Sequence, residues 1–294
     1  MWEYRGSIME NVGNFKEFLR RYNEDIERKR RAVENRIRRE LKVDWLDVEG
    51  KWYLEVLKGK RVVGVDGSQI SPLRELGIPI GVVQVAKIWV IHGTGKYGKS
   101  YITSFVRLEE NIDVRRFQLE MGMLMEEMDG ESWLFFDGSL IVHPSDDEMI
   151  RTVSKALSMS EETETPLIGY VDKSFSKDVA RMFGLDVYDS LLLSGMMDVF
   201  SYTQPLEKED ICYSYVMVNP TMPVRIEYPA WMKDMHEEIV KTVVAECLLG
   251  KTRGYPYILE RAHHYSCIDA KARASFMKAV KSQGVSFKWM SKIR

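Results

Sequence analysis

Apolar and polar positions divide the chain into a long charged helix, a run of strands, and then alternating helices and strands. From Phe15 to Leu41, apolar residues recur at spacings of three, four or seven among dense charge. This pattern is typical of a long amphipathic helix with a narrow apolar seam. Such a seam suits packing against a second copy of the helix or against its own domain. We therefore predict an N-terminal helical arm over residues 1–45.

Two short apolar runs end in the same tripeptide, Asp-Gly-Ser. The first, RVVGVDGSQ, spans Arg61–Gln69, and the second, WLFFDGSL, spans Trp133–Leu140. Apolar runs of this length, bounded by glycine, predict strands that are buried on both faces of a sheet. Each strand is expected to end at its aspartate, Asp66 or Asp137, and the chain to turn at the following Gly-Ser.

The segments around these two strands show the periodicities of further strands and helices. Further strands are predicted at Gly81–His92, Tyr101–Leu108 and Pro166–Val171, and helices at about Asp113–Met128, Ser145–Met159 and from Ser176. The order is strand, strand, strand, helix, strand, helix, strand, helix. It indicates an α/β domain over residues 46–270, whose mixed sheet is flanked by helices and followed by a C-terminal helical part.

The overall composition is that of an ordinary globular protein. Apolar residues make up 45% and charged residues 29% of the 294 positions. No run of about 18 apolar residues occurs, and the N-terminus lacks a signal-peptide pattern, so we expect a cytoplasmic protein without a membrane partner. The three cysteines, Cys212, Cys247 and Cys267, form no C-x-x-C pair and are expected as reduced core residues.

The net charge of −2 conceals a strong asymmetry along the chain. Lys16–Lys42 carries a net charge of +5, Lys271–Arg294 one of +7 and residues 1–15 one of −1, which leaves −13 on residues 43–270. A basic tail over residues 271–294 that also contains aromatic residues could bind a phosphate backbone and stack on bases. The other interpretation of the tail is a solvated terminal helix. The acidic middle of the chain could hold cations.

Two carboxylates are expected side by side in the predicted sheet. The carboxyl ends of neighbouring parallel strands meet at one edge, so Asp66 and Asp137 should lie close together there. Glu120 lies at the shoulder of the apolar stripe of the Asp113–Met128 helix and can point along the same edge. Glu126 or Glu127 could replace it if the helix has another register. Clustered carboxylates of this kind favour a divalent cation such as Mg²⁺ or Mn²⁺.

A glycine-rich segment offers an alternative function. Gly93–Ser100, GTGKYGKS, fits the phosphate-loop pattern G-x-x-x-x-G-K-[ST], and WLFFD resembles the apolar run and aspartate of an ATPase. A phosphate loop must lead into a helix, whereas the sequel YITSFVRL is rich in β-branched and aromatic residues. We therefore interpret residues 93–100 as a hairpin turn. A P-loop-type ATPase is the alternative function, and a catalytically inactive nucleic-acid-binding module is the third.

The order of elements resembles the ribonuclease H-like nuclease core, with Asp66 and Asp137 at the ends of two strands and Glu120 in the helix between these strands. Such a core implies two-metal hydrolysis of a phosphodiester, in which one ion activates the attacking water and the other stabilises the leaving oxygen. The two ions lie about 3.5–4 Å apart in such sites.

A motif near the C-terminus extends the resemblance. GYPYILERAH at residues 254–263, together with VDGSQ, FFDGSL and VDKS, resembles the NurA family of nucleases over about residues 60–270. The resemblance implies a Mn²⁺-dependent enzyme, with Mg²⁺ as an alternative ion, that is a single-strand endonuclease and 5′→3′ exonuclease. It also implies a role in DNA end processing and double-strand break repair, as a homodimer with a HerA-type hexameric helicase-translocase.

The resemblance carries site residues onto this sequence. It places the metal-site acids on Asp66, Glu120 and Asp137. It makes His263 the active-site histidine and a further metal ligand, and Tyr255 the active-site tyrosine. Lys173 occupies the position of a basic residue that could neutralise developing phosphoryl charge. His264 is a rival to His263. The residues leave open the strand polarity and the preference for DNA or RNA.

Overall fold

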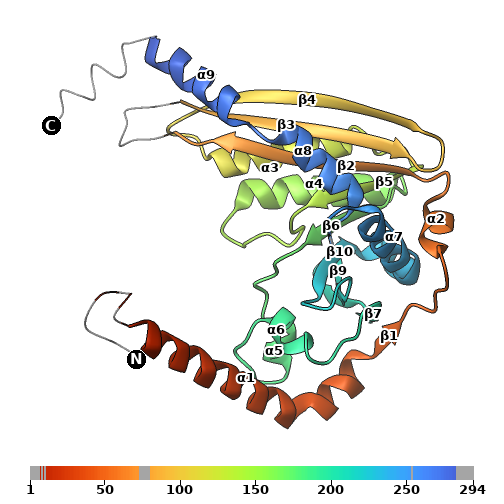
Figure 1. The fold of residues 1–294 in the computed structure, drawn as a ribbon. Coiled ribbons are helices and arrows are strands. Elements are labelled where there is room, and N and C mark those ends of the chain that lie inside the picture. Colours follow the sequence, from red (N-terminus) through yellow and green to blue (C-terminus); the bar gives the residue numbers. More distant parts are fainter. Residues whose placement is uncertain (1–6, 8, 10, 73–79, 253, 283–294) are drawn as a thin grey trace.

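The computed structural model describes residues 7, 9, 11–72, 80–252 and 254–282. Within them, ten strands form one mixed sheet in the order β1-β7-β9-β10-β6-β5-β2-β3-β4, with β8 beside β9 (Figure 1). The first strands are β1 (Val43–Trp45), β2 (Arg61–Ile70), β3 (Ile80–Ile91), β4 (Lys96–Arg107), β5 (Ser132–Asp137) and β6 (Leu167–Val171). The others are β7 (Ser201–Thr203), β8 (Leu206–Lys208), β9 (Ile211–Val216) and β10 (Val224–Pro229).

Half of this sheet has the strand order β4-β3-β2-β5-β6. The strands β2, β3 and β4 pair in antiparallel fashion, whereas β5 lies parallel to β2 and β6 parallel to β5. This arrangement confirms the predicted ribonuclease H-like α/β fold. The other half, built from β10 antiparallel to β6 and followed by β9, β7 and β1, was not predicted from the sequence.

Helices cover both faces of the sheet (Figure 1). The helices of the described residues are α1 (Val12–Leu41), α2 (Trp52–Leu57), α3 (Ile112–Met125), α4 (Asp147–Glu162), α5 (Asp178–Met182), α6 (Asp189–Leu193), the 3₁₀ helix η2 (Ala230–Met235), α7 (His236–Leu249), α8 (Tyr257–Ser266) and α9 (Ala270–Ser282). Val63 and Val65 of β2 pack into the core formed with α3 and α4. Val62 packs into the core formed with α7 and α8. Since neighbouring residues of β2 enter opposite cores, this strand is buried on both faces, as predicted.

The first Asp-Gly-Ser strand does not end at Asp66. It continues to Ile70, because the long strand β3 keeps pairing with it as far as Ile70 opposite Val82. Only the partner on the other side ends here, since Asp137 is the last residue of β5. Asp66 therefore lies within a strand and Asp137 at the end of one.

The segment GTGKYGKS contains the turn of a β-hairpin. The chain turns between Ile91 and Lys96, with positive φ angles at Gly93 (77°) and Gly95 (74°) that suit glycine. The second strand begins at Lys96, five positions before the predicted start at Tyr101. Because a strand and no helix follows residue 95, this segment lacks the geometry of a phosphate loop.

The long N-terminal helix is present as α1, and its second half packs within its own chain. Ile26, Ile37 and Leu41 are buried against α5, α6 and β9. Nearer the start of the helix, the apolar residues Phe15, Leu19 and Tyr22 are exposed. Packing on its own domain, one of the two predicted roles of the arm, therefore accounts for the second half only.

Three further expectations concern the surface and the ends of the chain. Among the described residues, every helix is too short or too polar to cross a membrane. Cys212 and Cys247 are buried, but Cys267 is exposed, so the expectation of three core cysteines was wrong for Cys267. The predicted basic tail is helical as far as Ser282, and residues 283–294 lie outside the described residues.

Candidate active site

Two aspartates lie next to each other on the central parallel strands. Val65 of β2 lies opposite Phe136 of β5, so the residues that follow them, Asp66 and Asp137, are neighbours on strands about 4.8 Å apart. Both line a cavity of about 370 Å³ at this edge of the sheet. The structure thus brings together the two carboxylates of the Asp-Gly-Ser motifs.

Glu120 reaches the same cavity from helix α3, and Gly67 makes room for it. A Cβ atom on Gly67 would overlap Oε1 of Glu120 and would lie 2.8 Å from Cγ of Arg116. A side chain at this position would therefore displace the carboxylate of Glu120 and the side chain of Arg116. The glycine of the first Asp-Gly-Ser motif serves this close approach, since Gly67 lies inside a strand and not in a turn.

The two alternative helix acids lie elsewhere. Glu127 pairs with Arg61 at 2.5 Å and with Lys87 at 2.8 Å, and Glu126 pairs with Lys87 at 2.8 Å. Arg61 is the first residue of β2, five positions before Asp66. Glu126 and Glu127 are thus held by these cations and do not line the cavity, which leaves Glu120 as the acid of α3 there.

The carboxylates of the site carry more negative charge than the nearby positive groups neutralise. Burial raises the pKa of Glu120 to about 8, and the nearby carboxylates of Asp66 and Asp137 add to this effect, against the partial opposition of Arg116. Burial also raises the pKa of Asp137 to about 6, although a hydrogen bond from Tyr255 opposes the change. Such shifts show that ionising these acids is costly in the absence of a compensating cation.

A histidine and a tyrosine hold the two aspartates from the other face of the sheet. Nδ1 of His263 lies 2.9 Å from Oδ2 of Asp66, and the hydroxyl of Ser266 donates to the same oxygen at 2.5 Å. Residues 263 and 266 are one turn apart on α8, so they face Asp66 together. The hydroxyl of Tyr255 donates to Oδ2 of Asp137 at 2.5 Å.

These two groups differ in what they can do further. The side chain of His263 is 68% exposed, so with Nδ1 turned to Asp66 its other ring nitrogen can meet an incoming group. Burial raises the pKa of Tyr255 well above its ordinary value, which keeps the phenol a neutral hydrogen-bond donor. His264 instead packs its ring against that of Tyr265, with centroids 5.2 Å apart. Of the two rival histidines, His263 is the one beside the acids.

Helix α8 can deliver His263 only because it comes very close to β2. A Cβ atom on Gly64 would lie 2.9 Å from the carbonyl oxygen of Ile258, so glycine is required at this crossing. The buried carboxylate of Glu246 accepts a hydrogen bond at 2.8 Å from the amide of Ile258, in the first turn of α8. Its other oxygen lies 2.5 Å from Nε2 of His92. These contacts fix the height of α8 above the sheet.

A comparison with protein families agrees with this geometry. The family model named NurA domain matches residues 60–268. The chain belongs to the NurA family. The match covers the acids, the tyrosine and the histidine of the site.

Solved structures of NurA share the fold. A crystal structure of NurA bound to dAMP and manganese has a TM-score of 0.55 and 11% identity, with 94% of this chain and 97% of that chain covered. A crystal structure of NurA with manganese has a TM-score of 0.53 and 10% identity, with 94% and 99% covered. At these identities the likeness shows the fold alone. A comparison with curated protein sequences finds no match.

The donor atoms at the site of this NurA-family chain fit a hard divalent cation. Asp66, Glu120 and Asp137 offer carboxylate oxygens, and His263 offers an imidazole nitrogen beside them. The raised pKa values of Glu120 and Asp137 reflect negative charge that a cation would offset. Across the described ranges no group of three or more such side chains already has the spacing of a metal site. The carboxylates would therefore have to close on the ion.

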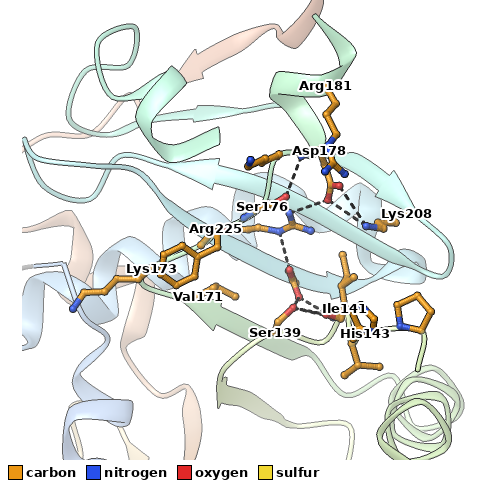
Figure 2. Close-up of a pocket in the computed structure, with 16 residues that line it drawn as sticks. Ser139, Ile141, His143, Val171, Lys173, Ser176, Asp178, Arg181, Lys208 and Arg225 are labelled. Atoms are coloured by element: carbon orange, nitrogen blue, oxygen red, sulfur yellow. Dashed lines mark hydrogen bonds and ion pairs between the residues drawn. The ribbon is translucent and has the colours of Figure 1, made fainter. Parts of the chain in front are cut away.

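Lys173 follows β6 at the same edge of the sheet but does not line the cavity of the acids. It is exposed and borders a neighbouring cavity of about 620 Å³, where its side chain extends away from the other labelled residues (Figure 2). Its role toward phosphoryl charge remains a prediction. The preceding residue, Asp172, was not among the predicted site residues, but it lies close enough to Asp137 to help raise the pKa of that residue.

A buried ion-pair network that the sequence analysis missed fixes the loop after Asp137. Oε2 of Glu227 accepts hydrogen bonds from the amides of Leu140 and Ile141, at 2.7 and 3.0 Å, and from the hydroxyl of Ser139 at 2.8 Å. Nε of Arg225 lies 2.7 Å from the other oxygen of Glu227, and a second nitrogen of Arg225 lies 3.3 Å from Asp178. Figure 2 shows Arg225 between Asp178 and the loop at Ser139.

The network could have been suspected from one signal only. Arg225 and Glu227 stand in the apolar setting of VRIEYP, where charged residues are rarely buried without a partner. Both side chains are almost fully buried. They bind the second Asp-Gly-Ser loop from β10, and so they support Asp137 without contacting it.

Proposed function

We propose that this chain is a metal-dependent nuclease that hydrolyses phosphodiester bonds of DNA. The observation that carries the proposal is the convergence of Asp66, Glu120 and Asp137, from β2, α3 and β5, on one cavity that burial has made unfavourable for negative charge. Carboxylates from separated elements are the usual holders of Mg²⁺ or Mn²⁺ in nucleases. The manganese and dAMP in the related NurA structure support the same choice.

We assign a separate role to each residue of the site. Asp66, Glu120 and Asp137 would hold the ions, with His263 as a further ligand. Bound ions of this kind lower the pKa of a coordinated water and offset charge on the phosphate. Tyr255 and Ser266 orient the aspartates through their hydrogen bonds. With Nδ1 of His263 facing Asp66, the other nitrogen of its exposed ring is the one that would coordinate an ion. Lys173 would meet the phosphate from the β6 side.

The finer activities follow from the family. We propose a single-strand endonuclease and 5′→3′ exonuclease with two Mn²⁺ or Mg²⁺ ions per site, which acts in DNA end processing and double-strand break repair in the cytoplasm. Its partners would be a second copy of the chain and a HerA-type hexameric helicase-translocase. A phosphate-loop ATPase is ruled out at residues 93–100 by the hairpin. An inactive binding module would not need the three acids that line the cavity.

Cleavage assays with purified protein test the nuclease. Labelled single-stranded DNA should be cut with Mn²⁺ or Mg²⁺ and left intact with EDTA, with or without ATP. A matched RNA strand and strands labelled at either end give the substrate preference and polarity. Intact DNA in all metals, or cleavage that EDTA does not affect, would contradict the proposal.

In the absence of metal, the free energy of unfolding should depend on pH because of the raised pKa values of Glu120 and Asp137. Native Glu120 holds its proton up to about pH 8 whereas the unfolded chain releases it near 4.5, so the native state binds more protons between these values. Without metal, the free energy of unfolding should therefore fall as pH rises through this window. Asp137 adds to the fall below about pH 6.

Urea unfolding in EDTA and in Mn²⁺ measures this effect. Mn²⁺ should reduce the loss at high pH, because it binds the ionised carboxylates of the native state. In Glu120→Gln the dependence should be much weaker even in EDTA. A metal-free stability that rises across the window would show that Glu120 ionises without cost.

The exposed half of α1 is the proposed dimer contact. Replacing Phe15, Leu19 and Tyr22 together by serine should yield a monomer, because these residues extend the apolar seam beyond the part buried in the chain. Light scattering measures the mass. Deletion of residues 1–42 removes this contact as well, but it also uncovers the core around Ile37 and should lower solubility. A dimer that persists in the triple variant would show that the arm is not the interface.

A further inference from the structure

One face of the edge strand β4 carries three aromatic and two basic side chains, together with one threonine. We call the residues at its odd positions the β4 stripe: Tyr97, Lys99, Tyr101, Thr103, Phe105 and Arg107. Side chains two positions apart on a strand share a face and stand about 7 Å apart. The three aromatic residues are 68%, 48% and 69% exposed, in chain order. A strand surface that exposes so much aromatic area indicates a binding surface.

The stripe forms one wall of a groove against helix α8. The ring of Tyr265 meets that of Tyr101 with centroids 6.5 Å apart, and Nζ of Lys99 lies 4.2 Å from the centroid of Tyr265. Arg261 donates to the hydroxyl of Tyr265 at 2.9 Å. The groove encloses about 340 Å³. Its apolar and aromatic lining includes Ile88, Val90, Tyr97 and Tyr257.

The charge of the groove selects an anionic ligand. Lys96, Lys99 and Arg261 line it, and no carboxylate does so among the described residues. This is unusual in a chain whose residues 43–270 carry a net charge of −13. Stacked aromatic rings beside fixed cations are the usual platform for single-stranded nucleic acid, which presents bases and phosphates in alternation.

The strand register connects the stripe to the acids. Asp66 lies opposite Ala86 of β3, and Ala86 lies opposite Tyr101 of β4. Directly opposed residues of antiparallel strands point to the same face, so Asp66 and Tyr101 share one row of the sheet, about 10 Å apart. Helix α8 bridges them, since His263 contacts Asp66 and Tyr265 contacts Tyr101. A strand lying on the stripe would therefore lie within about 10 Å of Asp66, on the other side of helix α8.

We propose that the β4 stripe and its groove bind the single-stranded segment of the nucleic acid next to the bond at the acids. The inference rests on the proposed nuclease function and adds the path of the strand. Bases stack on Tyr97, Tyr101 and Phe105, while Lys99 and Arg261 contact phosphates. From Tyr97 to Phe105 the stripe extends roughly 27 Å, enough for several nucleotides of an extended strand.

Binding without cleavage tests the stripe. Fluorescence anisotropy with labelled oligothymidylate in EDTA should show about five- to tenfold weaker binding for Tyr97→Ala, and a larger loss for the double variant with Tyr101→Ala. Tyr97→Phe keeps the stacking area and should bind as the wild type does. Lys99→Ala should reduce the slope of log affinity against log salt by about 0.7. Trp45→Ala, an exposed aromatic on the opposite edge strand β1, should change nothing.

The outcomes separate this proposal from the nuclease function. Loss of binding in the alanine variants, together with a wild type that binds but cuts nothing in Mn²⁺, would keep the stripe and refute the nuclease. Equal binding by the double variant and the wild type would refute the stripe, as would a wild type that does not bind the oligonucleotide. Unchanged binding with a changed mass in light scattering would identify the stripe as a contact between subunits instead.

Discussion

Asp66→Asn and Asp137→Asn should each lower metal-dependent DNA cleavage by at least about 1000-fold, equivalent to about 4 kcal/mol of transition-state stabilisation. Each substitution keeps the size of the side chain and removes the negative charge that would hold a cation. The amide introduced by Asp66→Asn can still accept a hydrogen bond at its remaining oxygen, so the variant tests the charge and not the contact with α8. Cleavage of labelled single-stranded DNA in Mn²⁺ measures the loss.

Folding has to be checked in the same variants. Asp137→Asn should be at least as stable as the wild type in EDTA at neutral pH, because the wild-type carboxyl is costly to ionise where it lies. Asp186→Asn is the matched control, since Asp186 is exposed and pairs with Lys177 far from the cavity. Near wild-type cleavage by either site variant would remove that aspartate from the active site.

The second large effect is expected at Glu227, which does not touch the cavity of the acids. Glu227→Gln removes a buried charge and leaves the guanidinium of Arg225 with only Asp178 opposite it. Breaking a buried ion pair from one side costs about 3–5 kcal/mol. Urea unfolding should show a loss of about this size, and cleavage should fall because the loop after Asp137 loses its anchor.

Hydrogen exchange gives a direct view of the same loop. The amides of Leu140 and Ile141 donate to Glu227, so their exchange should accelerate in Glu227→Gln far more than that of the β2 amides. Asp178→Asn serves as the comparison, because it removes the other partner of Arg225 and leaves the loop hydrogen bonds in place. Unchanged exchange at residues 140 and 141 would show that the loop is held by other contacts.

The parts of the site that could be predicted from the sequence are those marked by a short motif. A buried strand followed by Asp-Gly-Ser can be recognised within nine residues, and the matched pair of motifs indicated adjacent carboxylates. The choice among Glu120, Glu126 and Glu127 could not be made in this way. It depends on how α3 lies against β2, and Gly67 and the ion pairs of Arg61 and Lys87 determine this placement.

Other features depend on partners distant in the sequence. β2 was predicted to stop at Asp66, because the length of its partner β3 cannot be read from the strand itself. Glu227 is 90 residues beyond Asp137, and nothing in VRIEYP shows which loop it will meet. The start of β4 was placed too late because lysine, glycine and serine at residues 96–100 favour a turn by composition, whereas pairing with β3 makes them a strand.

The continuation of β2 past Asp66 gives the two aspartates different freedom to move. Asp66 is embedded in a ladder that pairs with β3 from Arg61 to Ile70, so its backbone can leave its place only when the centre of the sheet opens. Asp137 is the last residue of its strand and is followed by a loop. One carboxylate is thus fixed at about the stability of the whole domain, whereas the position of the other also depends on the loop that Glu227 anchors. A change at the loop anchor should therefore shift Asp137 while Asp66 stays in place, so the distance between the two carboxylates is set from β10 as well as from the central strands.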